Sequence, residues 1–96
     1  MKPASSIRFA FGGVVATPGA DALLRKHNIA PVRLLARHLA GDWGDVPPED
    51  AQANEAALRS GARLLSAYTL PGGEKLWIIT DAEPRAATTF LTPGEY

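Results

Sequence analysis

His38 is the residue of this sequence best suited to acid–base chemistry. A histidine titrates near neutral pH, so it can give or take a proton under ordinary conditions. On a helix His38 would lie at the edge of an apolar stripe, because it follows Leu34 by four residues and Leu35 by three. The nearby cations Arg33 and Arg37 would suit an anionic substrate. A histidine at such a boundary can equally be a hydrogen-bonded structural residue, and the sequence leaves both interpretations open.

The chemistry that this histidine could serve is cleavage of RNA through its own 2′-hydroxyl, without a metal or a thiol. In that reaction a histidine moves protons, arginines stabilise the charged phosphorane and threonine hydroxyls orient the phosphate. The candidate catalytic set is His38, Arg37, Arg63, Arg85 and Thr89. Each member also has a structural role open to it, since threonines favour strands and arginines make surface ion pairs.

Other catalytic chemistries lack their residues. The sequence has no cysteine, which excludes disulfides, thiol nucleophiles and cysteine-ligated metal or iron–sulfur centres. It has no G-x-S-x-G, G-x-G-x-x-G or G-K-[ST] motif for a serine nucleophile or a nucleotide. His38, Asp42 and Asp45 could be drawn together as metal ligands, but their H-x-x-x-D-x-x-D spacing is not an established ligand pattern. We therefore expect no metal and no cofactor.

Charge is balanced overall but not along the chain. Ten basic residues match ten acidic ones, yet residues 1–40 carry six Lys and Arg against one acid, and residues 41–96 carry four against nine. One interpretation is a nucleic-acid-binding regulator that uses the basic first part, although zero net charge and the lack of a helix-turn-helix pattern count against it. The other interpretation is that the two parts neutralise each other within the fold.

The composition is typical of a soluble, cytoplasmic protein with no membrane contact. Hydrophobic residues make up 46% of the chain and charged residues 21%, as in ordinary globular proteins. No apolar run approaches 18 residues, and Met1–Ser6 does not resemble a signal peptide. Ninety-six residues leave room for one hydrophobic core, so we expect a single domain over residues 1–96.

The elements that would position the candidate residues form an α+β pattern of one strand, three helices and an antiparallel three-stranded meander. The first strand spans residues 7–16, with a break at Gly12-Gly13. Helix start signals at Thr17-Pro18 and other prolines, and glycine stop signals, delimit the helices. The helices are expected at residues 18–27, 31–40 and 48–60. Alternating apolar residues then predict strands at residues 63–70, 75–80 and 87–92.

The turn at Gly72-Gly73 decides which side chains share a face of the sheet. Symmetric pairing about this turn places Tyr68 opposite Trp77. Three short helices can cover only one face, so an aromatic face would remain as a contact surface for a partner protein or a second copy of the chain. Alternatively, the loop of residues 41–48 covers this face with Trp43 as its lid. The candidate binding residues are Asp42, Trp43, Asp45, Tyr68 and Trp77.

Several segments match a pattern that is specific when taken together, above all a G-D-W-G loop and a T-T…P-x-E-Y terminus. The segments are Ala16–Ala20, Arg37–Asp45, Arg63–Tyr68, Leu76–Thr80, Thr88-Thr89, Pro93 and Glu95-Tyr96. They resemble a family of small bacterial proteins carried on plasmids, phages and integrated elements, usually labelled hypothetical or plasmid-related. The likeness covers about residues 11–96. Family members tend to have acid-Asp-Arg-Ser before the threonine pair, where this chain has Glu83-Pro84-Arg85-Ala86. The resemblance implies a mobile-element context and no particular activity.

The order of elements is also similar in architecture to barnase-, colicin- and RelE-like ribonucleases, although architecture alone does not give function. Three hypotheses follow. The first is a non-enzymatic binding protein of a mobile element, which acts through a sheet face and the Trp43 loop on a partner or as a homodimer. In this case His38 would be packed with both ring nitrogens hydrogen-bonded. The alternatives are a metal-independent, toxin-like ribonuclease and a nucleic-acid-binding regulator.

Overall fold

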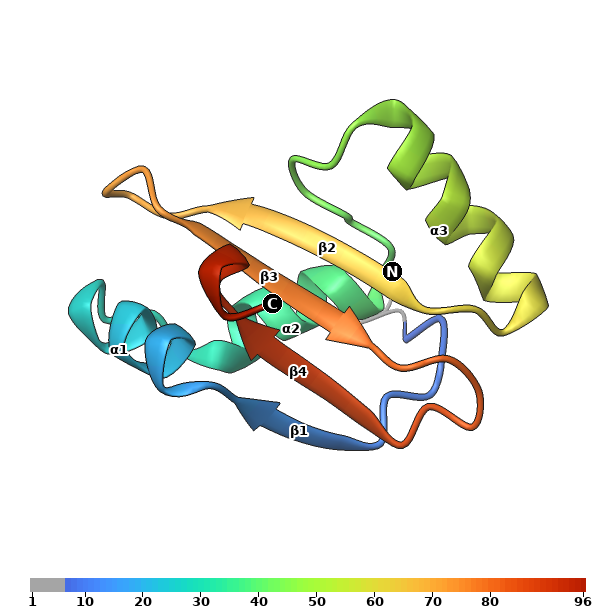
Figure 1. Cartoon of the computed structure of the whole chain (residues 1–96), viewed down its shortest axis with the longest axis horizontal. Coiled ribbons are helices and arrows are strands. Elements are labelled where there is room, and N and C mark those ends of the chain that lie inside the picture. Colours follow the sequence, from blue (N-terminus) through green and yellow to red (C-terminus); the bar gives the residue numbers. More distant parts are fainter. Residues whose placement is uncertain (1–6) are drawn as a thin grey trace, which may run out of the picture.

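The computed structural model describes residues 7–96, which form one strand, three helices and three further strands in that order (Figure 1). The strands are β1 (Gly13–Ala16), β2 (Leu64–Thr69), β3 (Lys75–Thr80) and β4 (Ala87–Leu91), and the helices are α1 (Pro18–Lys26), α2 (Pro31–Leu39) and α3 (Pro48–Ser60). A 3-10 turn, η1 (Pro93–Glu95), follows β4. The predicted α+β class and order of elements are confirmed. The expectation about Met1–Ser6 lies outside the described residues.

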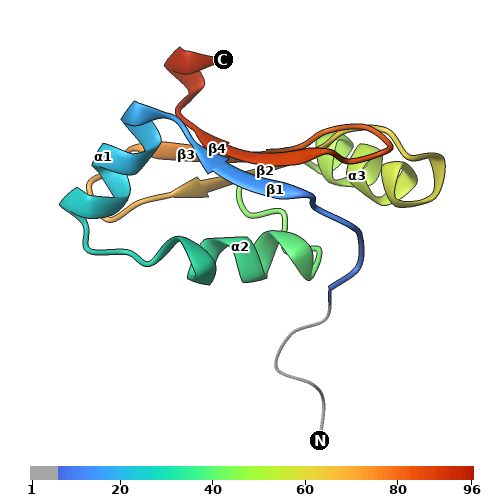
Figure 2. The ribbon, with the colours of Figure 1, turned by 90° about the horizontal axis from the view of Figure 1, so that it is seen from below.

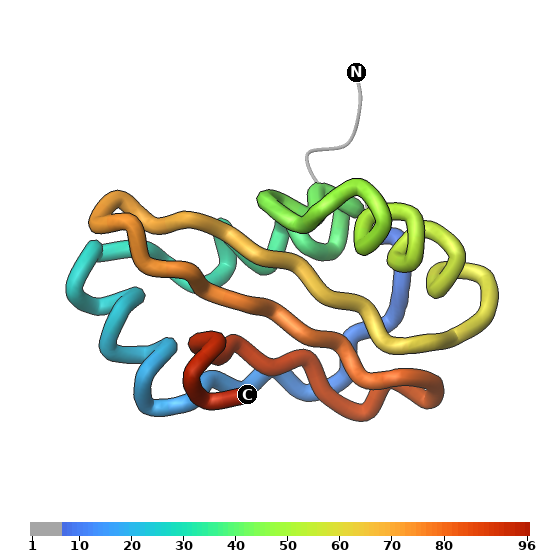
Figure 3. Tube along the Cα trace, turned by 45° about the horizontal axis from the view of Figure 1, so that its top comes forward, coloured from blue at the N-terminus to red at the C-terminus, as the bar shows by residue number. Residues whose placement is uncertain are grey.

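The four strands form one mixed sheet in the order β1-β4-β3-β2. β2, β3 and β4 are the expected antiparallel meander, and β1 is added beside β4 in parallel orientation. Figure 3 shows the blue β1 segment beside the red β4 segment. All three helices lie in the connection between β1 and β2. This connection links the two edge strands of the sheet, because β1 and β2 lie at its opposite ends.

The two faces of the sheet are covered unequally. In Figure 2, α2 lies beneath one face with α1 at its end, while η1 stands on the other. We call the α2 side the closed face; its strand residues are Leu64, Ser66, Tyr68, Leu76, Ile78, Thr80, Thr88 and Phe90. The other side is the open face; its strand residues are Leu65, Ala67, Trp77, Ile79, Thr89 and Leu91. All eight closed-face residues are buried, so this side holds the core.

Helix ends follow the local signals of the sequence. The side chain of Thr17 accepts a hydrogen bond from the Ala20 amide at the start of α1 (3.2 Å). Each helix has a proline in its first turn, where the missing N–H costs no hydrogen bond. Gly61 ends α3 in a left-handed conformation with φ of +82°. The predicted helix bounds are therefore right to within one residue.

The first strand is shorter than the predicted residues 7–16, since only the last four of these pair with the sheet. The preceding residues run from α2 toward the sheet: the Arg8 amide donates to the Leu39 carbonyl (2.9 Å), and Phe9 is buried. Gly12 makes the turn into β1 with φ of +60°. A Cβ there would lie 2.2 Å from a backbone carbonyl oxygen. The apolar residues of this run serve the core instead of a strand ladder.

The β2–β3 hairpin is shifted by one residue from the predicted register. Tyr68 lies opposite Leu76 and not opposite Trp77. The cause is the turn, in which the Leu70 amide donates to the Glu74 carbonyl (2.8 Å) and leaves three connecting residues instead of four. A shift of one residue moves every β3 side chain to the other face. Tyr68 and Trp77 therefore lie on opposite faces, and the predicted joint aromatic face does not form.

A helix that crosses a membrane must be both long and predominantly apolar. Within residues 7–96, no helix meets both requirements.

Candidate functional site

His38 lies on the closed face, where the structure buries it completely (0% exposed). Its Nδ1 is 2.6 Å from Ser66 Oγ on β2, and its Nε2 is 2.9 Å from Thr80 Oγ1 on β3. Thr80 Oγ1 is 2.8 Å from Thr88 Oγ1 on β4, and the Thr88 hydroxyl donates to the Phe11 carbonyl (2.8 Å). The side chains of Ser66, His38, Thr80 and Thr88 form what we call the polar chain.

The direction of every hydrogen bond in the polar chain follows from its last acceptor. The Phe11 carbonyl can only accept, so the single proton of the Thr88 hydroxyl is used there. Thr80 must then donate to Thr88, and His38 Nε2–H must donate to Thr80. Burial favours the neutral ring, in which Nδ1 carries no proton and accepts from the Ser66 hydroxyl. The histidine is therefore the neutral Nε2–H tautomer, held by two partners.

The surroundings of His38 disfavour its charged form. Burial lowers the pKa of His38 to about 4. The rings of Phe9 and Trp43 pack edge-on against the imidazole, with centroids 5.2 and 5.9 Å away. A neutral, enclosed imidazole whose nitrogens are both hydrogen-bonded has no free atom to present to a substrate. This is the packing that the binding hypothesis predicts for His38.

The other members of the candidate ribonuclease set do not converge on His38. Thr89 alternates with the buried Thr88 along β4, so its side chain lies on the open face. Arg63 also serves the open side, where its guanidinium lies 5.4 Å from the centroid of the Tyr96 ring and donates to the Tyr96 hydroxyl. The sheet therefore separates these two residues from the histidine.

Arg85 is buried, with 2% of its surface exposed, and its guanidinium serves the backbone. It donates to the carbonyls of Ala57 and Ala62 and to that of Asp81, at 3.0–3.1 Å. Its Nε also lies 3.2 Å from a Glu83 carboxylate oxygen. Arg85 ties the end of α3 to the β3–β4 connection, so its charge is not directed toward a cleft.

Among the candidate binding residues, Asp42, Trp43 and Tyr68 are used within the fold. The Asp42 carboxylate accepts from Arg37 Nε (2.7 Å), and its carbonyl accepts from the Tyr68 hydroxyl (2.6 Å). Trp43 is 6% exposed and donates its indole N–H to Glu55 (3.0 Å). Trp43 therefore packs on the core side and is not a lid over the open face, and Tyr68 does not line that face.

The loop of residues 41–48 closes the outer edge of β2. The Ala67 amide donates to the Trp43 carbonyl (3.1 Å), and the Asp45 amide donates to the Ala67 carbonyl (2.7 Å). These bonds make Gly44 a single-residue bridge partner of Ala67. A Cβ at Gly44 would lie 2.0 Å from the Ala67 oxygen, and its φ is +74°, so only glycine fits here.

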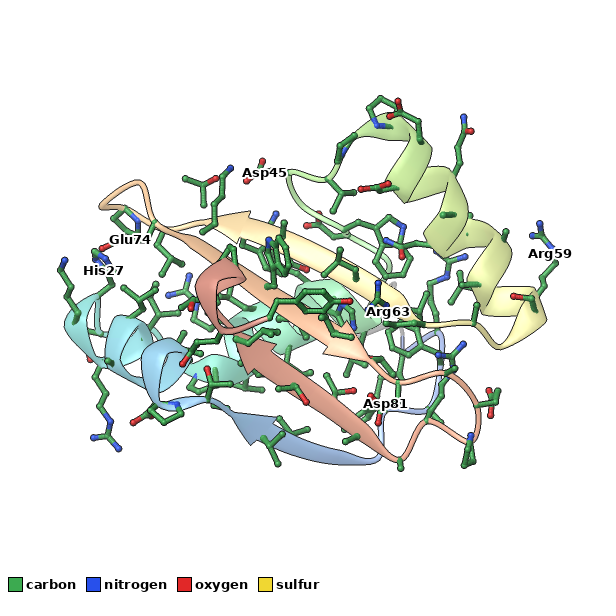
Figure 4. The ribbon with its side chains drawn as sticks, in the orientation of Figure 1. His27, Asp45, Arg59, Arg63, Glu74 and Asp81 are labelled. Atoms are coloured by element: carbon green, nitrogen blue, oxygen red, sulfur yellow. The ribbon has the colours of Figure 1, made fainter. Side chains whose placement is uncertain are left out.

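Asp45 and Trp77, the two remaining candidate binding residues, border a groove on the open face. This β2 groove has a volume of about 270 Å³ and lies between the start of α3 and the β2–β3 hairpin. A further hollow of about 190 Å³ continues it toward Arg63, since the two share Asp50 and Leu65. Figure 4 shows Asp45 on the loop before α3 and Arg63 at the start of β2, near the two ends of this surface.

The floor of the β2 groove is apolar and its rim is charged. The floor residues are Val46, Pro47, Leu65, Ala67, Trp77 and Pro93. The rim residues are Asp45, Asp50 and Lys75. The Thr69 hydroxyl donates to Asp45 (2.7 Å) and lowers the pKa of that carboxyl, while Lys75 Nζ lies 3.9 Å from it. Two carboxylates against one ammonium group make the rim negative.

Sequence reasoning identified only Asp45 and Trp77 of this groove. It missed Val46 and Pro47, although one signal was available: an apolar residue followed by two prolines in an otherwise polar loop. Such a residue either enters the core or lines a surface hollow, and the structure half-buries Val46 in the groove wall.

The charge imbalance along the chain is partly resolved by pairing between its two parts. The cations of residues 1–40 that pair with later acids do so at 2.7–3.3 Å. These pairs are Arg8–Glu55, Lys26–Glu74 and Arg37–Asp42. This arrangement favours the interpretation in which the two parts neutralise each other.

Residues 7–96 contain no group of three or more His, Asp or Glu side chains placed to hold a metal ion. No protein-family model matches the chain, and no curated protein or solved structure matches it. The fold and the candidate site together define a small α+β protein with a sealed polar chain on one sheet face and an apolar, acid-rimmed groove on the other.

Proposed function

We propose that this chain is a cytoplasmic, non-enzymatic protein-binding module of a mobile genetic element, and that the β2 groove holds a segment of its partner. The observation that carries the proposal is the make-up of the groove, in which a half-buried Trp77 lies among apolar side chains beneath a charged rim. Partly exposed aromatic side chains in apolar hollows are typical anchors of protein interfaces. The mobile-element context rests on the sequence resemblance.

The rim favours a particular kind of partner segment. Asp50 is exposed, forms the N-terminal turn of α3 and has no ion pair among residues 7–96, while Asp45 already faces Lys75. A partner segment with an apolar side chain next to a lysine or arginine would fit this site. The apolar side chain would cover the floor, and the cation would pair with Asp50. Opposite charges at such a rim raise the association rate and select among partners.

The enzymatic alternative has less support. The candidate base is neutral and enclosed, and Arg85 is committed to backbone carbonyls. Thr89 and Arg63 lie across the sheet from His38. Acid–base groups must come within hydrogen-bond reach of the reacting atoms, and no such cluster forms among these five residues.

The binding proposal is tested with a random 12-residue peptide library displayed on phage and selected on the immobilised protein. We expect enriched peptides to carry an apolar residue next to Lys or Arg, and we expect a synthetic copy to shift the Trp77 indole resonance in NMR spectra. Asp50→Lys should weaken its binding about tenfold through lost and reversed charge at the rim.

The matched control is Glu49→Lys, which makes the same change in the same first turn of α3 outside the groove. Both variants remove one carboxylate from the helix N-terminus, so both have a similar effect on folding. Equal binding by the two variants, or enrichment of no peptide above background, would count against the β2 groove as the binding site.

The ribonuclease alternative is tested separately with end-labelled RNA in excess chelator. We expect no more cleavage than in buffer, because His38 cannot reach a substrate. Thr89→Val and Arg63→Ala alter exposed or half-exposed side chains, so both variants should fold. Chelator-resistant cleavage that either variant loses would favour the ribonuclease hypothesis instead.

A further inference from the structure

The two outer edges of the sheet differ in whether their backbone groups are satisfied. On β2, the outward amide and carbonyl of Ala67 bond to the loop before α3. The outward amide and carbonyl of Leu65 bond to the side chain of Asn54. Asn54 Nδ2 donates to the Leu65 carbonyl (2.7 Å), and the Leu65 amide donates to Asn54 Oδ1 (3.1 Å). The chain therefore closes the β2 edge against further strand pairing.

The β1 edge is open. The amides of Gly13 and Thr17, at its two ends, donate to carbonyls of the β4 segment (3.0 and 2.9 Å). Because alternate residues of a strand face alternate neighbours, the amides and carbonyls of Val14 and Ala16 point away from β4. All four β1 residues are exposed, and Figure 1 shows no helix along the outer side of β1.

We propose that the β1 edge pairs with the same edge of a second copy of this chain, in antiparallel orientation about a two-fold axis at Val15. In this register Val14 lies opposite the partner's Ala16, and the outward groups of both residues are hydrogen-bonded. Val15 then lies directly opposite its own counterpart. The product is a continuous eight-stranded sheet with a closed β2 edge at each end.

The backbone geometry, exposure and charge of β1 favour a second copy of this chain as its partner. Within β1, the outward-facing backbone groups are those of Val14 and Ala16, one residue on either side of Val15, so this edge is complementary to itself under a two-fold rotation. Val14 and Val15 are 43% and 53% exposed and point to opposite faces, so pairing buries apolar surface on both. β1 carries no charge or proline, the usual guards of a free edge, and zero net charge keeps copies from repelling each other.

This interface is independent of the β2 groove, which lies at the opposite edge of the sheet. A dimer would therefore present two grooves. Because β1 has only four residues, the contact is small, and we expect a weak, concentration-dependent dimer.

The pairing is tested by sedimentation equilibrium from about 10 μM to about 1 mM, a range that spans weak association. The wild type should pass from monomer to dimer. Val15→Lys and Val15→Glu should each stay monomeric, because like charges would lie directly opposite each other. A one-to-one mixture of the two variants should dimerise again. Val32→Lys, which charges another exposed valine on α2, should dimerise like the wild type.

A second measurement follows the backbone directly in the wild type. Amide exchange at Val14 and Ala16 should slow as the concentration rises, while exchange at Val15, whose amide already faces β4, should not change. A monomeric wild type would overturn the proposal and leave this edge to another protein. A Val15→Lys variant that dimerises normally, or a mixture that stays monomeric, would also overturn it.

Discussion

The closed and open faces of the sheet use their polar residues in opposite ways. On the closed face every member of the polar chain is buried and hydrogen-bonded, and among residues 7–96 no buried side-chain polar atom lacks a partner. On the open face Asp45 and Asp50 stand at the rim of an apolar groove, exposed to solvent. Residue types that suggest catalysis can therefore serve the core, whereas ordinary surface residues line the groove that is the candidate site.

The largest expected effect comes from breaking the polar chain at its centre. His38→Ala should reduce the free energy of unfolding by about 3–5 kcal/mol, because it leaves a cavity and removes a hydrogen-bond partner from Ser66 and Thr80. Urea denaturation followed by circular dichroism measures this loss. His27→Ala is the matched control: this histidine is partly buried at the end of α1 and its side chain hydrogen-bonds Glu74, so its loss should be smaller, about 1–2 kcal/mol. Similar small losses in both variants would contradict a structural His38.

The second effect is a pH dependence that originates on the closed face. The pKa of His38 is about 4 in the folded protein and 6.5 in the reference state. Between these values the unfolded chain binds a proton that the folded chain does not, so stability is complete above pH 6.5 and falls as the pH drops toward 4. The difference corresponds to about 3 kcal/mol. Urea midpoints at half-unit pH steps measure it.

The two carboxylates with strongly depressed pKa values do not contribute to this pH window, because they titrate lower. Glu74 and Glu95 have pKa values of about 2, against 4.5 in the reference state. Their contribution is present above pH 4.5 and is lost as the pH falls toward 2. A flat stability profile between pH 6.5 and 4.5 would show that the imidazole is not sealed from water.

Sequence patterns predicted the elements well because the determinants are local. Thr17, the prolines in the first helical turns and Gly61 specify helix ends through bonds within a few residues. The hairpin register failed for a different reason. It depends on whether three or four residues make the turn after Leu70, and a glycine-rich turn admits both.

The candidate site was predicted in part for a related reason. Asp45 and Trp77, two of the candidate binding residues, border the β2 groove, whereas the one-residue difference in register places Tyr68 in the core. The position of Trp43 depended on contacts with Phe9 and Glu55, far away in the sequence. Such long-range packing leaves no local signal. The residues of the G-D-W-G loop thus make structural contacts within the fold. The resemblance of this loop to the plasmid-related family stays a prediction.

A smaller effect compares the two faces through one conservative substitution at adjacent positions. Thr88→Val removes a buried hydroxyl that bonds Thr80 and the Phe11 carbonyl, so it should cost about 1–2 kcal/mol of stability. Thr89→Val changes the half-exposed neighbour on the open face and should alter stability by about 0.5 kcal/mol or less. Equal losses in parallel urea titrations would mean that the two faces do not differ as described.

The smallest effect concerns the clasp that holds η1 on the open face. The Glu95 carboxylate accepts from the Thr17 hydroxyl (2.5 Å) and from the Gly19 amide (2.9 Å), and the Thr17 bond is the main cause of its low pKa. This clasp positions Tyr96, whose ring meets Trp77 edge-on at 5.6 Å.

Glu95→Gln replaces an acceptor-only carboxylate with an amide, so η1 should loosen without unfolding the sheet. We expect the Trp77 indole resonance to shift while that of Trp43, enclosed on the other side, stays in place. Glu49→Gln, an exposed carboxylate at the start of α3, is the control and should move neither resonance. An unchanged Trp77 signal would mean that η1 does not govern access to the open face, and the contrast between the faces would then rest on the β2 groove alone.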